Sequence, residues 1–191
     1  MIDETAGEQQ RSSEERLLQG AFVMAVFAAA WAVLGVSGLS SHLPTPALLL
    51  VAAATVAVAA GALGLTVRYG KAAGPRRTRQ VAADSLRRFR QVTIGQSLAI
   101  GAVVVVLGPV TGQGFHIPAA VCVVVGLHFL PLASAFGQSQ YRWTAGALTA
   151  LGLTGVLVLA GGSDPAAVQA LVGLGAAVVL WATALDVARR G

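Results

Sequence analysis

A single histidine, His128, lies in the middle of a long apolar run, within the segment 126–133. If this run is a helix that crosses a membrane, the imidazole lies roughly 12 Å from the cytoplasmic end, inside the hydrocarbon. Ionisable side chains at such a depth are rare and often belong to a ligand site or a proton path. Pro131 follows in the same run and leaves the carbonyl of Leu127 without its usual helical partner. His128 and Pro131 are therefore candidate ligand or pathway residues.

A structural role for His128 is the alternative, in which a neutral imidazole hydrogen-bonds a neighbouring helix. Gln96 and Ser97 lie in the preceding apolar run, roughly 7–9 Å from its cytoplasmic end. Because the two runs form a hairpin, these side chains should come within about one helical turn of His128 in depth. We predict a polar contact between His128 and Gln96 or Ser97, which either locks the bundle or lines a path.

Three further polar residues, His42, His116 and Asp164, lie in short turns between apolar runs. Two imidazoles and a carboxylate can bind a metal ion, but the spacing here does not demand one. Asp164 precedes a proline, an arrangement typical of a helix N-cap. We therefore predict neither a metal site nor a cofactor. Cys122 is the single cysteine, so no intrachain disulfide can form.

Motifs of the common enzyme classes are missing from the sequence. There is no phosphate-binding glycine loop, nucleophile-elbow serine, zinc-binding histidine pair or paired-cysteine motif. No acid lies at mid-depth in any apolar run, which counts against proton-coupled pumps and cation exchangers. We therefore expect a non-enzymatic protein with a structural, accessory or self-associating role. The alternative is a permease or channel for a small neutral solute, with a polar site around His128.

The elements that must position these residues are long apolar runs. The 191 residues are 55% hydrophobic and 11% charged, whereas soluble domains average about 25% charged residues. This composition excludes a soluble enzyme, a secreted disulfide scaffold and a disordered tail. A span needs about 20 helical residues, and lipid-exposed strands would leave backbone groups unpaired. The sequence predicts an all-α bundle of six transmembrane helices in three hairpins, near residues 20–40, 46–67, 92–110, 117–136, 144–160 and 166–185.

All thirteen basic residues fall on one side of this topology. They lie in the polar tail 1–19, the loop 68–91, the turn around Arg142 and the tail 188–191, which flank a membrane domain of residues 20–187. The positive-inside rule then places both termini in the cytoplasm. Poor aromatic interleaving in the loop argues against a nucleic-acid partner. We expect the loop to lie on anionic lipid headgroups, chiefly through Arg76, Arg77, Arg79, Arg87, Arg88 and Arg90.

Small and aromatic residues give weaker signals. Ser97/Gly101 and Ala57/Gly61 are small-residue pairs that allow helices to approach closely. Polar residues elsewhere in the spans, such as Thr183, are expected to be structural because threonine often bonds its own helix. Three aromatic residues near cytoplasmic span ends predict an interfacial belt: Tyr141, Trp143 and Trp181.

The segment around His128 resembles a stretch of small six-helix membrane proteins of bacteria, which also carry a tyrosine shortly after it, here Tyr141. The resemblance covers roughly the third to fifth spans. It implies the six-helix fold and no particular activity. Abundant Ala, Gly, Val and Arg are also typical of a GC-rich bacterial genome. We therefore expect a multi-pass protein of the bacterial inner membrane, with a second copy or another membrane protein as its partner.

Overall fold

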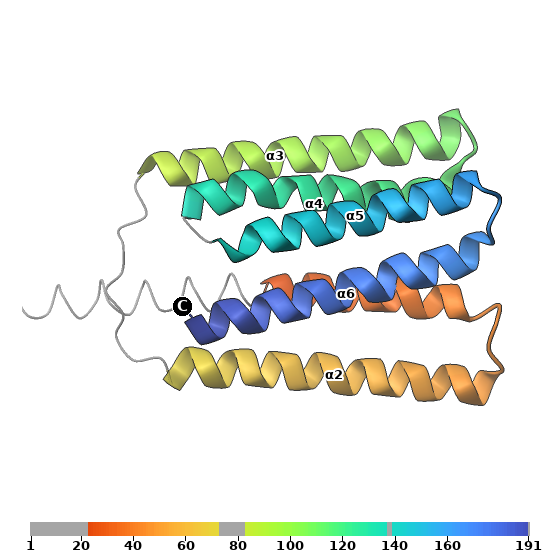
Figure 1. Cartoon of the computed structure of the whole chain (residues 1–191), viewed down its shortest axis with the longest axis horizontal. Helices are drawn as coiled ribbons and strands as arrows, with labels where there is room; N and C mark the ends of the chain where they lie inside the picture. Colours follow the sequence, from red (N-terminus) through yellow and green to blue (C-terminus); the bar gives the residue numbers. More distant parts are fainter. Residues whose placement is uncertain (1–22, 73–82, 137–138, 191) are drawn as a thin grey trace, which may run out of the picture.

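The computed structural model describes residues 23–72, 83–136 and 139–190, and every regular element in them is helical. Two short elements interrupt the α-helices, a π-helix at Val106–Val110 and a 3₁₀ turn at Gly114–His116. The prediction of an all-α fold is confirmed over these residues. Figure 1 shows the α-helices side by side, and they are a first helix Val23–Leu39, α2 (Thr45–Ala72), α3 (Ala83–Val105), α4 (Ile117–Phe136), α5 (Gln140–Ala160) and α6 (Pro165–Arg190).

Five of the segments are long and apolar enough to cross a membrane: Thr45–Leu65, Arg90–Val110, Gly114–Ser134, Gln140–Ala160 and Pro165–Arg189. The first helix is apolar as well, but shorter over its described residues. By length and composition the chain is therefore a multi-pass membrane protein. The short turns after the first helix, after the π-helix and after α5 all lie at one end of the molecule, which we call the turn end (Figure 1).

Helix boundaries differ from the predicted ones mainly at the end opposite the turn end. The predicted second span ends at residue 67, but α2 continues through Gly70 to Ala72. One glycine costs only about 1 kcal/mol relative to alanine inside a helix, which a long helix tolerates. The third predicted span starts near residue 92, whereas α3 already begins at Ala83.

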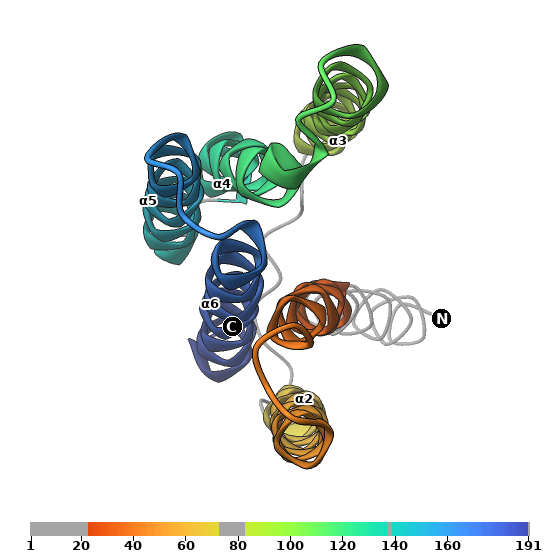
Figure 2. The same cartoon turned by 90° about the vertical axis from the view of Figure 1, so that its right-hand side faces the viewer.

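The helices form a row whose order differs from the order in the sequence. Viewed from the turn end, α3, α4, α5 and α6 follow one another along an arc, and the first helix and α2 both lie against α6 (Figure 2). Helices α2 and α3 are consecutive in the chain but lie at opposite ends of this row. Both are peripheral: no residue of the apolar part of α3 is buried, and Ala62 alone is buried among the described side chains of α2.

Glycine allows the central helices to touch backbone to backbone. A Cβ atom built on Gly173 of α6 would lie 2.4 Å from the backbone nitrogen of Gly35 in the first helix. In the same way, a Cβ on Gly126 of α4 would lie 2.6 Å from the backbone nitrogen of Thr149 in α5. Small residues permit this close approach, which replaces hydrophobic burial as the main source of helix association in lipid.

The turn end of α3 changes its helical geometry at Pro109, which lies inside the π-helix. Proline has no N–H to donate, and its ring collides with the carbonyl four residues earlier in an α-helix. The wider π turn accommodates the ring, and the N–H of Thr111 donates to the carbonyl of Val106 at 3.0 Å. Gly112 follows with φ +67°, a backbone conformation that favours glycine, and the chain then turns toward α4.

Candidate functional site

His128 lies on the side of α4 that faces α3. The backbone carbonyl of Val92 in α3 lies near the imidazole, whereas Nδ1 is buried and has no hydrogen-bond partner among the described residues. The neighbouring ring of Phe129 is buried and packs at 5.7 Å, centroid to centroid, against Tyr141 of α5. The structure therefore places His128 at the α3–α4 seam that the sequence predicted, with one ring nitrogen unsatisfied.

The structure brings Gln96 near this seam but does not join it to His128 by a hydrogen bond. Val92, the α3 residue beside the imidazole, precedes Gln96 by four residues, or about 6 Å along the helix. Gln96 is partly buried and makes no hydrogen bond within the described part of the chain. The exposed Ser97 hydroxyl donates to the carbonyl of Thr93 in its own helix at 3.0 Å. Gln96 and Ser97 thus lie at a similar membrane depth to His128, but neither forms the predicted hydrogen bond with it.

Pro131 lies inside α4, which continues through it to Phe136. The Ser134 hydroxyl donates to the carbonyl of Pro131 at 2.9 Å, so this carbonyl has a hydrogen-bond donor within its own helix. A groove among the described residues lies along α6, and its lining includes neither Pro131 nor His128.

The cationic loop residues are only partly within the described structure. Arg87 and Arg90 are exposed near the beginning of α3. Arg88 belongs to the same helix. The predicted headgroup residues Arg76, Arg77 and Arg79 lie outside the described residues.

Two of the three polar turn residues meet across the turn end. His42 Nε2 lies 2.8 Å from Asp164 Oδ2, which ties the turn after the first helix to the turn before α6. Asp164 Oδ2 also accepts the N–H of Ala167 at 2.8 Å, which confirms its predicted role as the N-cap of α6. His116 lies on another turn, where its ring stacks on Phe115 at a centroid distance of 4.4 Å. Among the described residues, no group of three metal-binding side chains comes together.

The cap also sets the acidity of Asp164. The backbone N–H of Ala167 holds the pKa of this carboxyl below its ordinary value of 3.8, partial desolvation opposes the shift, and the His42 ring lowers the pKa further. Asp164 is thus an exposed anion over the physiological pH range. The pair offers an imidazole and a carboxylate to any molecule at the turn end.

Hydrogen bonds between helices involve polar residues within the spans, of which Thr183 is predicted from the sequence to be structural. The Gln169 amide of α6 donates to the Leu34 carbonyl at 3.1 Å and to the Ser37 hydroxyl at 2.9 Å. The hydroxyls of Thr144 in α5 and Thr183 in α6 are 2.7 Å apart and buried. Their spacing in the sequence carries no sign of these partners, because the partners lie far away along the chain.

The aromatic belt is only partly as predicted. Trp143 is 84% exposed, as an interfacial residue should be. Trp181 is wrong as a belt residue: it is 6% exposed and belongs to the core, and its Nε1 has no partner among the described residues. Because α6 lies at the middle of the row, its residues near the span end are covered by other helices.

Comparison of the chain with protein-family models, with curated proteins and with solved structures found no match.

Proposed function

We propose that this protein is a non-enzymatic, six-span protein of the bacterial inner membrane that works as a self-associating structural bundle, with both termini in the cytoplasm. The positive-inside rule supports this orientation, since the turn end carries no Lys or Arg and the opposite side carries all of them. The core of α4, α5, α6 and the first helix holds the bundle together, and the two outer helices remain for contacts with a second copy.

The outer face of α3 carries the proposal. Thr93, Ser97 and Gly101 are all exposed and follow one another at intervals of four residues, so they form one line on the helix. A Cβ atom on Gly101 would meet nothing within 4 Å. No described residue of the chain covers this small-residue line, although such lines allow two helices to approach closely.

A polar group beside this line favours another helix over lipid as its neighbour. The Gln96 amide lies one residue from Ser97 and has no hydrogen bond in the described residues. Hydrocarbon offers no hydrogen-bond partner, and an unsatisfied amide there is costly. Association of two α3 helices would supply amide or hydroxyl partners from the second copy and would cover the small-residue line.

Disulfide cross-linking in native membranes tests this interface. In a Cys122→Ser background, Ser97→Cys should give cross-linked dimers after mild oxidation. Leu157→Cys is the matched control, because Leu157 is 71% exposed on α5. Adding Gly101→Ile should suppress the Ser97→Cys dimers, whereas Gly146→Ile, at another open position, should not. Equal cross-linking at positions 97 and 157 would contradict the interface.

The unsatisfied Nδ1 of His128 favours a second candidate, a permease or channel for a small neutral solute. Its pathway would follow the α3–α4 seam past Gln96 and Pro131. Solute flux into proteoliposomes separates the two functions. A permease requires flux that His128→Ala abolishes without loss of thermal stability. A structural bundle predicts tight liposomes and a lower melting temperature for the same variant.

A further inference from the structure

We propose that a groove on α6 binds one acyl chain of a zwitterionic phospholipid, whose phosphate and ammonium groups sit at His42 and Asp164. The site goes beyond the self-association proposed above and uses a different face of the molecule. It belongs to the leaflet that surrounds the turn end.

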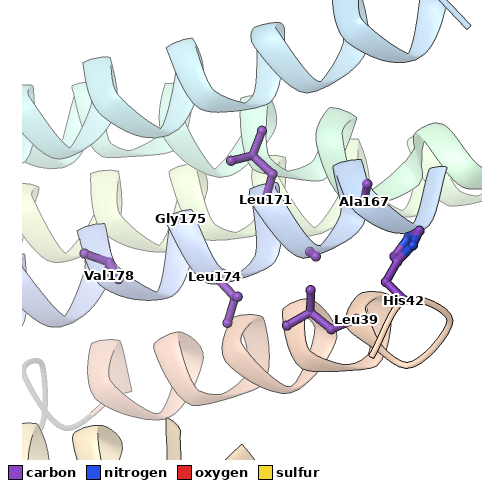
Figure 3. A pocket seen from close by; sticks show the side chains of 8 residues that line it. Leu39, His42, Ala167, Leu171, Leu174, Gly175 and Val178 are labelled. Carbon is purple, nitrogen blue, oxygen red and sulfur yellow. The ribbon is translucent and has the colours of Figure 1, made fainter. Parts of the chain in front are cut away.

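The groove is apolar over nearly its whole length. It has a volume of about 630 Å³ and runs along α6 beside the end of the first helix. Figure 3 shows Leu39 and Leu174 on one side and Leu171 on the other. Ala167 and Gly175 are small, which leaves the helix surface hollow between the larger side chains. A hydrocarbon chain is the ligand that such a lining accepts.

The length of the groove matches one leaflet. Its α6 lining extends from Ala167 to Val178, about 16 Å at 1.5 Å per residue. Half of the ~30 Å hydrocarbon layer is about 15 Å. A chain that enters at the turn end would therefore fill the groove and end near the midplane, as a lipid chain of that leaflet does.

The polar end of the groove selects the headgroup. His42 is the polar residue of the lining, and its Nε2 is held by Asp164. Both side chains are partly exposed, at 41% and 52%. The Asp164 carboxylate can accept a hydrogen bond from an ammonium group, and Nδ1 of His42 remains available to the same headgroup.

The charge at this end also disfavours an anionic headgroup. The turns there contain no Lys or Arg, so a phosphate without an ammonium group would lie beside the Asp164 carboxylate with no fixed cation to offset it. Phosphatidylethanolamine carries both charges, whereas phosphatidylglycerol carries only the negative one.

Lipid titration of the full chain in detergent, followed by native mass spectrometry, tests the site. The probes are phosphatidylethanolamine, phosphatidylglycerol and diacylglycerol with the same acyl chains. We expect phosphatidylethanolamine to bind about tenfold more tightly than either of the others. Equal binding of all three would overturn the headgroup assignment.

Two variants locate the acyl chain. Leu171→Trp and Val178→Trp place a large ring at positions that are 52% and 61% exposed along the groove, and each should weaken binding about tenfold. Leu157→Trp, on the exposed face of α5, is the matched control and should bind like the wild type. Unchanged binding in both groove variants, with melting temperatures like that of the control, would overturn the site.

His42→Gln tests the headgroup contact separately. It should remove the preference for phosphatidylethanolamine over diacylglycerol while leaving the effect of Leu171→Trp in place. Cross-linking through α3 is unaffected by any of these variants if the two sites are independent, so failure of the lipid site and failure of the α3 interface give different results.

Discussion

His42 and Asp164 are 122 residues apart in the sequence, yet Nε2 of one lies 2.8 Å from Oδ2 of the other. The contact joins the first hairpin turn to the last one. It also involves the carboxylate that caps α6. One carboxylate oxygen thus holds a helix end and a distant turn at the same time.

The first prediction concerns the loss of thermal stability at acidic pH. In the folded chain the Ala167 N–H and the His42 ring lower the pKa of Asp164, and this lowering exceeds the opposing effect of desolvation. The ionised carboxylate therefore contributes its full stabilisation above the ordinary carboxyl pKa. This contribution disappears as the pH falls through the lowered pKa. The melting temperature in detergent should therefore fall as the pH is lowered below about 4.

Asp164→Asn provides the control for this prediction. Asparagine is also a good N-cap, but it has no charge to lose on acidification. The variant should melt below the wild type at neutral pH and should lack part of the acid-dependent fall. If both proteins show the same pH dependence, the Asp164 carboxyl is not a source of it.

A second prediction concerns the contact between the first helix and α6. Gly35→Ala adds a Cβ 2.6 Å from the backbone nitrogen of Leu174, so the two helices must move apart. Overpacking of this kind costs about 1–3 kcal/mol, which should lower the melting temperature. Gly61→Ala is the control, since a Cβ there meets nothing within 4 Å and alanine favours the helix. Equal effects of the two substitutions would show that the contact is unimportant.

Buried hydroxyls give a third prediction. Thr144 and Thr183 lie 2.7 Å apart between α5 and α6. A double-mutant cycle with Thr144→Val and Thr183→Val should yield a coupling free energy of about 0.6 kcal/mol, and at most about 1.7, the range found for hydrogen bonds between membrane helices. Unfolding in a mild detergent by denaturant measures it. If the two substitutions change the free energy of unfolding additively, the hydroxyls are not coupled.

The orientation of the chain gives the fourth prediction. In a Cys122→Ser background, Ser163→Cys at the turn end should react with a membrane-impermeant maleimide added to intact cells. Arg90→Cys should react only after the cells are opened. Both native side chains are exposed, so burial does not explain a difference. The reverse pattern would overturn the predicted topology.

The positions of the helices could be predicted from the sequence, but which helices pack against one another could not. Apolar length and proline or aspartate at the turns predicted where α4 and α6 begin, because these signals act within a few residues. The hairpin argument also placed His128 beside α3, since adjacent spans joined by a short turn pack together.

Contacts between distant helices could not be predicted in this way. Nothing in the residues around Gly35 indicates α6 as its neighbour, and Gly61 has the same chemistry but faces open space. In lipid, helices associate through close packing rather than through burial of apolar surface. Hydropathy therefore does not show which face of a helix packs against the other helices. Trp181 was assigned to the interface for the same reason.

The pairing of the first helix with the last has a consequence for biogenesis. At about 5–20 residues per second, the ribosome needs roughly seven to thirty seconds to make the chain between Gly35 and its neighbour Gly173. During that time the first helix resides in the bilayer without the surface that fits its glycines. The bundle is therefore complete only after α6 has been made, and a chain interrupted before α6 leaves the glycine face of the first helix without the surface that it contacts.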